Sequence, residues 1–199
     1  LVIRKMAKKK AESISDNVLW FSGDRYYTLK RKKEAIAKIN KDGSWIIRDI
    51  SNIKNAEDFS QALFPKDLLS FADKTILVFE GKYLPDGEVC HKMISNMGDD
   101  RIVIIVTPSV DKRTKFADIF KPYLKEFESI IDNKGFVNFS KIPERLEFFK
   151  KDINWQGSEK LLQFIVENSE YNLTGASQEI HKLSLYTLKN DTDMTEQAY

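Results

Sequence analysis

The 199-residue sequence contains a single cysteine, eight glycines and five prolines. The one cysteine, Cys90, excludes an internal disulfide and indicates a reducing compartment. So little glycine and proline excludes a low-complexity or collagen-like chain. No apolar run approaches the roughly 20 residues that a membrane-spanning helix needs. No apolar stretch follows the basic start, as it would in a secretory signal. We therefore expect a cytoplasmic protein with no membrane partner.

Strong charge of one sign and metal-binding clusters are also missing. The 32 Lys and Arg residues nearly balance 30 Asp and Glu residues, so no overall field attracts nucleic acid. The two histidines, His91 and His181, have no Cys, Asp or Glu cluster at metal-ligand spacing. Asp99 and Asp100 fit a helix-to-strand turn better than a metal pair. There is no nucleophile elbow or acid–base pair. We expect no catalytic residues, metal or cofactor.

The sequence does contain a regular alternation of strand and helix patterns. Short apolar runs alternate with apolar residues at helical spacing from residue 18 to residue 139. Asn55 is expected to cap one of the helices, and Pro122 to kink or split another. The pattern predicts an α/β fold, with a mostly parallel sheet flanked by helices on both faces. The expected strands are 18–22, 45–49, 76–79, 101–107 and 136–139, and the expected helices are 26–40, 56–63, 88–97 and 115–127.

The pattern changes after Pro143, where only helical periodicity follows. Short connections between the expected helices favour a small helical domain. We therefore predict a basic, flexible N-terminal segment over 1–17, an α/β domain over 18–142 and a three-helix domain over 143–199. The expected helices of that last domain are 144–153, 158–168 and 173–188.

The turn after the first expected strand, at Gly23, is where a phosphate-binding loop would begin. Such a loop needs a second glycine followed by Lys and Ser or Thr, so that backbone N–H groups surround the phosphates. Counting from Gly23, those places hold Thr28, Leu29 and Lys30. Without the second glycine the loop cannot take the required shape. Nucleotide binding and hydrolysis are therefore not expected.

The helix after this turn carries a run of cations. Lys30, Arg31 and Lys33 are candidate contacts for DNA phosphates, and Lys38 and Lys41 extend the same basic face. The alternative is an ordinary solvated helix face, since Glu34 and Asp42 are interleaved with the cations.

The stretch 68–80 combines two kinds of apolar residue. Residues 76–79 form a continuous apolar run typical of a buried strand. Leu69 and Phe71 come just before it, at an expected helix end, where burial within the monomer is not required. Those two residues are therefore candidates for contact with a partner.

Several motifs occur in an order typical of one family. They are LWFSGD at 19–24, the stretch 68–79, the strand 101–106, DKRTK at 111–115, and the stretch 172–186 with its Asn-Leu and Glu-Ile-His-Lys-Leu elements. With them the chain, from Val18 nearly to its end, resembles the delta subunit of the bacterial DNA polymerase III clamp loader.

The resemblance implies an AAA+/RecA-like first domain that has lost its ATPase function, followed by a helical lid domain. It implies an accessory, non-enzymatic subunit of a DNA polymerase holoenzyme, which binds and opens the ring-shaped sliding clamp during DNA replication. The implied clamp-binding residues are Leu68, Leu69, Ser70 and Phe71. The implied partners are the sliding clamp, the other clamp-loader ATPase subunits and primer–template DNA.

In that family a third, C-terminal collar domain follows, and residues 192–199 are expected to lead toward it without containing it. Two alternatives from other classes stay open. One is a nucleic-acid-binding module that uses the helix face from Lys30 to Lys41. The other is a nucleotide-dependent enzyme of the P-loop type, which measurable ATP turnover would reveal.

Overall fold

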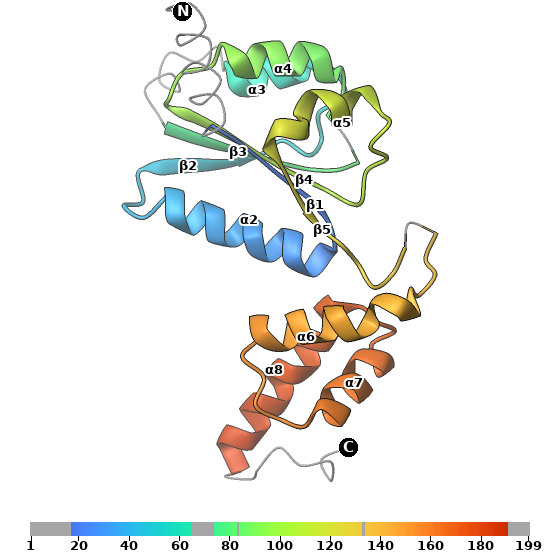
Figure 1. Ribbon diagram of the computed structural model, residues 1–199. Coiled ribbons are helices and arrows are strands. Elements are labelled where there is room, and N and C mark those ends of the chain that lie inside the picture. Colours follow the sequence, from blue (N-terminus) through green and yellow to red (C-terminus); the bar gives the residue numbers. More distant parts are fainter. Residues whose placement is uncertain (1–16, 65–73, 83, 133, 191–199) are drawn as a thin grey trace, which may run out of the picture. The chain divides into compact units, whose positions relative to one another are not determined.

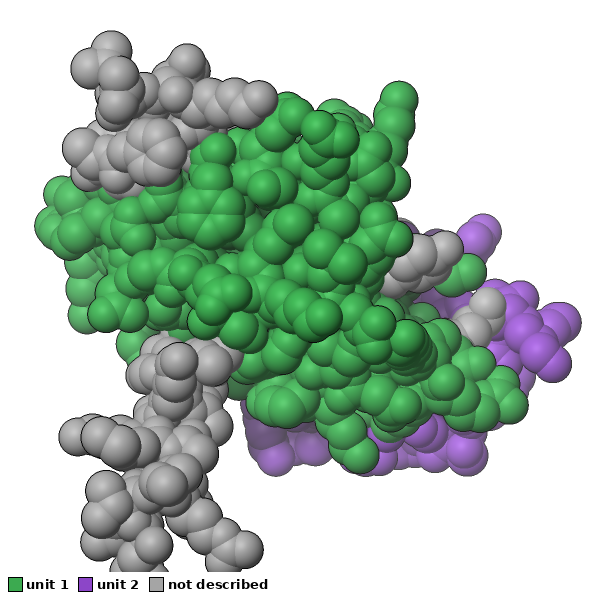
Figure 2. Space-filling model, turned by 90° about the horizontal axis from the view of Figure 1, so that it is seen from above, with its two compact units in different colours: residues 1–127 green, residues 128–199 purple. Residues whose placement is uncertain are grey.

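The computed structural model describes residues 17–64, 74–82, 84–132 and 134–190. The chain divides into two compact units, Leu1–Phe127 and Glu128–Tyr199, coloured green and purple in Figure 2. The expected N-terminal segment 1–17 lies, except for its last residue, outside the described residues. The division after Phe127 comes before the boundary expected at Pro143, and the limits of the functional domains stay a prediction.

A five-stranded sheet with the order β2-β3-β4-β1-β5 forms the centre of the first unit. All four neighbouring pairs run parallel, so each connection must cross over the sheet. The expected α/β fold with a parallel sheet between helices is therefore confirmed (Figure 1). The strands are β1 (Val18–Gly23), β2 (Trp45–Asp49), β3 (Lys74–Glu80), β4 (Arg101–Thr107) and β5 (Leu124–Phe127).

The helices cover the two faces of this sheet unequally. Figure 1 shows α2 on one face and α3, α4 and α5 on the other. The expected cap of α3 is confirmed, because the Asn55 side chain accepts a hydrogen bond from the Asp58 amide at 2.9 Å. Among the described residues of this unit, α2 is therefore the only helix on its face of the sheet. The four helices are α2 (Arg25–Ile39), α3 (Ala56–Leu63), α4 (Gly87–Ser95) and α5 (Lys115–Phe120).

Burial of the central strands explains why their sequences are apolar throughout. Every residue of β4 is buried, as expected for a parallel strand covered on both faces. Ile102, Ile104 and Val106 pack on the α2 side, whereas Val103 and Ile105 belong to the core on the opposite side. The bounds predicted for this strand from its sequence, 101–107, are those of the structure.

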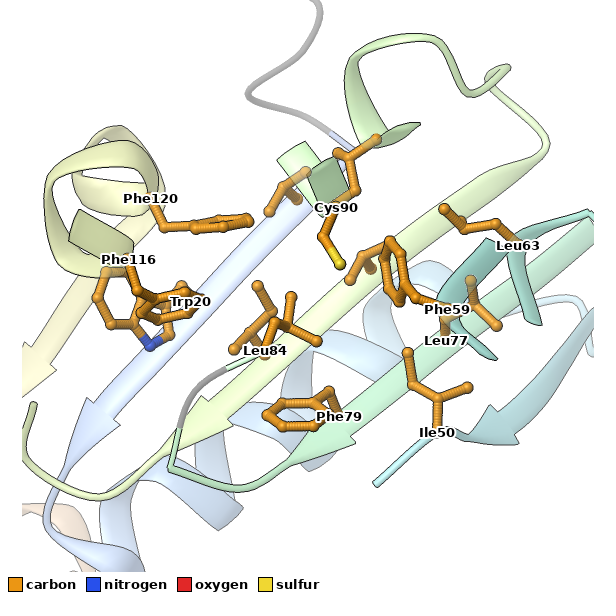
Figure 3. Close-up of a cluster of buried hydrophobic side chains, with 14 of the residues drawn as sticks. Trp20, Ile50, Phe59, Leu63, Leu77, Phe79, Leu84, Cys90, Phe116 and Phe120 are labelled. Atoms are coloured by element: carbon orange, nitrogen blue, oxygen red, sulfur yellow. The ribbon is translucent and has the colours of Figure 1, made fainter. Parts of the chain in front are cut away.

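The larger core lies between the sheet and helices α3, α4 and α5. In Figure 3, Trp20 and Phe116 lie close together, with Phe120 nearby. The rings of Trp20 and Phe116 are 5.1 Å apart in an edge-to-face arrangement. Phe59 and Leu63 bring α3 into the same cluster, and both are fully buried. Each such side chain contributes roughly 1.5–3 kcal/mol when it leaves water.

The predicted helix 115–127 is wrong beyond Phe120. The chain continues as a short 3-10 helix, η2 (Lys121–Tyr123), and then becomes β5. Pro122 has no N–H to donate to the carbonyl four residues earlier, and its ring disfavours a continued α-helix. The proline that was expected to kink or split the helix therefore marks its end.

The predicted strand 136–139 is also wrong. This segment makes one isolated antiparallel bridge, Ile131 to Val137, and a 3-10 helix, η3 (Phe139–Lys141), follows at once. Phe136 and Phe139 are 68% and 71% exposed, so the segment lacks the burial of a core strand. The fifth strand of the sheet is β5 (Leu124–Phe127), which precedes this segment in the chain.

The second unit contains helices α6 (Ile142–Asp152), α7 (Glu159–Asn168) and α8 (Leu173–Asn190). The Asn172 side chain accepts the Thr174 amide at 3.1 Å, and Leu173 is buried. The Asn-Leu element that contributed to the family resemblance therefore begins α8. Among the described residues, no helix is both long and apolar enough to cross a membrane.

Candidate functional site

In open α/β sheets, ligands usually bind just beyond the carboxyl ends of the strands. We call the corresponding part of this chain the carboxyl edge. It is formed by Gly23, Glu80, Thr107 and Phe127, which end β1, β3, β4 and β5. A cavity of about 350 Å³ opens beside the first three of these residues. The carboxyl edge is therefore the place to test for nucleotide chemistry.

The connection from β1 to α2 consists of one residue, Asp24. Gly23 has a φ of +113°, and a Cβ there would lie 1.8 Å from the carbonyl oxygen of Phe127. The Asp24 amide donates a 2.7 Å hydrogen bond to that same oxygen. Gly23 is thus required for close approach to β5. A connection this short leaves no chain to surround a phosphate group.

Asp24 also changes the electrostatics at the start of α2. Its carboxylate accepts a hydrogen bond from the Tyr26 amide at 2.9 Å, and only 8% of the residue is exposed. The first turn of a helix favours negative charge, which a bound phosphate would otherwise supply. In this chain a built-in carboxylate fills that role and would repel a phosphate.

Glu80 is held by a cation from the neighbouring helix. The Lys32 ammonium forms an ion pair with the Glu80 carboxylate, and both side chains are at least two-thirds buried. The amide of Glu80 donates to the Ser51 hydroxyl at 3.0 Å. The charge of this carboxylate at the end of β3 is therefore neutralised within the chain. A carboxylate that acted as a metal ligand or general base would instead have to be free to bind metal or substrate.

The hydroxyl groups of the carboxyl edge are also occupied. The indole N–H of Trp20 donates to the Thr107 hydroxyl oxygen at 2.8 Å, in a buried position. The Ser22 hydroxyl donates to the carbonyl oxygen of Pro108 at 2.9 Å. These two hydroxyl groups thus have partners within the chain, so they serve the structure of the edge.

Cys90 and His91, both on α4, have contacts within the chain. Burial raises the pKa of the Cys90 thiol to about 12, and the thiol donates to the Pro85 carbonyl at 3.0 Å. His91 packs edge-on against Phe120, with ring centres 5.6 Å apart. The described part of the chain holds no group of three His, Cys, Asp or Glu side chains that could bind a metal ion.

The three candidate DNA contacts lie on α2 but are held differently. Arg31 forms a 2.6 Å ion pair with Glu34, and its guanidinium lies 6.0 Å from the centre of the Phe127 ring. Lys33 is exposed, whereas Lys30 is partly buried and takes part in a further interaction. The three cations thus differ in exposure and in their partners within the chain, and their contact with DNA stays a prediction.

The four clamp-binding candidates, Leu68, Leu69, Ser70 and Phe71, lie outside the described residues. Described residues on both sides of them form hydrogen bonds with Asp100 and Arg101. The Arg101 side chain donates to the Leu63 carbonyl at 2.5 Å, and the Thr75 amide donates to the Asp100 carbonyl at 2.9 Å. Leu63 and Thr75 thus both lie beside the start of β4.

The positions of Lys125 and Phe127 differ from the sequence-based prediction, which placed both in a helix. Both belong to β5, where Lys125 is paired in register with Phe21 of β1. Their place on the sheet was missed because the sequence of 115–127 was interpreted as one helix. Pro122 was the available signal that a different element begins after it.

The fold and this edge define a class of protein: an α/β unit whose β1–α2 connection is too short for a phosphate loop, followed by a helical unit. No family model and no curated protein matches the sequence. Among solved structures, the chain is similar to the Bacillus subtilis DNA clamp loader delta protein, YqeN, with a TM-score of 0.54 and 14% identity. The match covers 89% of this chain and 57% of that protein, and at this identity the likeness is one of fold.

Proposed function

We propose that the chain is a clamp-loader subunit of the delta type, which binds and opens a ring-shaped sliding clamp without hydrolysing ATP. The observation that carries the proposal is the fold match to a DNA clamp loader delta protein over 89% of the chain. In this proposal, 18–142 form the AAA+-like domain and 143–199 the helical lid domain. The other clamp-loader subunits supply the ATPase activity, and the complex works in the cytoplasm.

The state of the carboxyl edge supports the non-hydrolysing part of the proposal. The β1–α2 connection is one residue long, Asp24 lies at the start of α2, and Glu80 is paired with Lys32. Each feature disfavours the binding of a nucleoside triphosphate and its metal ion. Magnesium-dependent ATP turnover by the pure chain would contradict this part and favour the alternative of a P-loop-type enzyme.

Leu69 and Phe71 are the proposed anchors on the clamp, with Leu68 and Ser70 beside them. Apolar side chains that enter a pocket on a partner often supply most of the binding energy of an interface. Opening the ring requires in addition that the chain binds the open form more tightly than the closed form. Tight binding alone would leave the ring closed.

The anchors can be tested by measuring the affinity of the chain for a purified ring clamp. We expect Leu69→Ala/Phe71→Ala to lower the affinity by about 100-fold, because two buried hot-spot side chains are lost. Ile47→Ala/Phe136→Ala is the matched control, since these two residues are 50% and 68% exposed and belong to other parts of the chain. Unchanged affinity of a folded anchor variant would refute the proposed anchors.

Ring opening needs its own measurement. A clamp preloaded on circular DNA should be released faster when the wild-type chain is added, and the anchor variant should leave the slow spontaneous rate unchanged. If the chain binds the clamp with no increase in release, then it is a clamp-binding protein and the opening function is wrong.

Contacts between α2 and primer–template DNA form a separate part of the proposal. Lys30, Arg31 and Lys33 would add phosphate contacts, each of which increases the salt dependence of binding. We expect Lys33→Gln to reduce the slope of log affinity against log salt by about one unit. An unchanged slope would remove Lys33 from the DNA interface without affecting the clamp proposal.

A further inference from the structure

The first unit contains a groove that lies outside the proposed clamp-binding segment and shares only Arg31 with the proposed DNA contacts. The groove lies between α2 and β5 and has a volume of about 570 Å³, within the range of roughly 300–1,000 Å³ typical of ligand pockets. Its apolar floor is formed by Leu19, Phe21, Ala35, Ile39 and Phe127. We call it the β5–α2 groove.

The groove exists because α2 covers its face of the sheet alone (Figure 1). The Lys32–Glu80 ion pair ties one side of α2 to the end of β3. On its other side, the Phe127 ring stacks on Tyr27 with centres 6.0 Å apart. Beyond this contact no second helix follows within the described part of the unit, so the apolar surface beside β5 stays accessible.

Strand β5 adds an unpaired edge next to the groove. Among the described strands it pairs only with β1, and its four residues alternate between the two faces of the sheet. Lys125 and Phe127 face the groove, whereas Glu126 is paired with Lys112 at 2.7 Å. The negative charge of β5 is therefore compensated by Lys112, and the positive charge of Lys125 is available at the groove.

The charges around the groove are unbalanced. Its rim carries Arg31, Lys38 and Lys125 against one carboxylate, Glu34. Arg31 and Glu34 bind each other at 2.6 Å. Within the described residues, Lys38 and Lys125 have no carboxylate partner. The groove thus combines an apolar floor with two uncompensated cations.

We propose that the β5–α2 groove binds an acidic, amphipathic peptide segment of a partner protein. Apolar side chains of the segment would cover the floor, and its carboxylates would pair with Lys38 and Lys125. A wholly apolar segment would bury both cations without partners, and a nucleic acid would leave the apolar floor uncovered. The inference does not depend on the clamp proposal, since the groove and the segment 65–73 share no residues.

The experiment uses the full chain and a short fluorescein-labelled peptide in which Glu and Asp alternate with Leu and Phe. We expect the peptide to bind and Lys38→Glu/Lys125→Glu to weaken binding at least about tenfold, because two attractions become repulsions. Lys54→Glu/Lys92→Glu is the matched control, because it changes the net charge equally: both lysines are exposed and neither lines the groove. It should bind the peptide as the wild type does.

A second variant tests the apolar floor without changing charge. Ala35→Trp should fill the groove and weaken peptide binding, while the same peptide with Gln and Asn in place of Glu and Asp should bind weakly to the wild type. Circular dichroism establishes that each variant is folded. The proposal is overturned if the folded variants bind like the wild type, or if a labelled single-stranded oligonucleotide binds at Lys38 and Lys125 and the acidic peptide does not.

Discussion

The carboxyl edge and the β5–α2 groove belong to the same sheet, yet their polar groups are in opposite states. At the carboxyl edge, Asp24, Glu80 and Thr107 are each bound by another group of the chain. At the groove, Lys38 and Lys125 have no carboxylate partner among the described residues. The two places on one sheet thus differ in whether their charged and polar side chains are paired within the chain.

Among the substitutions considered, one at Gly23 in the carboxyl edge should have the largest effect on stability. In Gly23→Ala the new Cβ would meet the Phe127 carbonyl oxygen at 1.8 Å with the backbone at φ +113°, so β1 and β5 must separate. We expect a loss of about 3 kcal/mol or more in the free energy of unfolding, measured by urea denaturation. Gly43→Ala is the control, because its φ is +72° and nothing lies within 4 Å; it should cost only about 1–2 kcal/mol.

If Gly23→Ala costs no more than Gly43→Ala, then the close approach of β5 is not what requires a glycine. The purpose of Gly23 would then have to be sought at the cavity beside it. That result would reopen a ligand-binding role for the carboxyl edge.

The buried hydrogen bond between Trp20 and Thr107 should have the next largest effect. Thr107→Val keeps the shape of the side chain but removes the acceptor of the indole N–H, which is bound at 2.8 Å in a buried position. An unsatisfied buried donor costs about 1–3 kcal/mol, measurable as a lower urea midpoint. Ser22→Ala, which removes the donor to the Pro108 carbonyl, should cost less, because an unbound carbonyl can accept water. Equal effects would indicate that water reaches Trp20 from the cavity.

The sequence predicts the buried strands better than the edge of the sheet, for a physical reason. The strand Arg101–Thr107 is apolar and β-branched because both its faces are buried, so its composition alone reveals it. Strand β5 has only four residues, and the middle two are Lys125 and Glu126. Because a strand at the edge of a sheet is less buried, its sequence need not be apolar. Such a strand has no periodicity that can be distinguished from the end of a helix.

The candidate sites differ in the same way. The missing second glycine after Gly23 could be noticed in the sequence, because a phosphate loop is a local motif. The groove could not be predicted from the sequence, because Lys38 and Lys125 are far apart in the chain. They line one groove only because β5 pairs with β1. The close approach of Gly23 to Phe127 could not be predicted either, because it depends on the pairing of β1 with β5.

Removing the positive charge from the groove should leave stability almost unchanged. Lys38→Gln/Lys125→Gln removes the charge of two side chains without carboxylate partners among the described residues. Lys38 lies in the last turn of α2, where a cation contributes only about 0.3–1 kcal/mol, so the free energy of unfolding should fall by less than about 1 kcal/mol. Urea denaturation checks this directly. A loss as large as that expected for Thr107→Val would mean that the two lysines are structural, and the contrast between the groove and the carboxyl edge would fail.

The smallest effect is expected at Asp111, in the loop that follows β4 at the carboxyl edge. The Arg113 side chain and amide bind its carboxylate and lower its pKa from 3.8 to about 2. A lowered pKa means that the ionised form is bound in the folded state, so this contribution is present above pH 3.8 and disappears as the pH falls toward 2. We expect NMR titration to give a pKa near 2 in the wild type, and Arg113→Gln to move it back toward the ordinary value. The Arg113 side chain is 89% exposed and that of Asp111 50%, so stability should hardly change. A wild-type pKa near 3.8 would show that Asp111 is not bound in this way in solution.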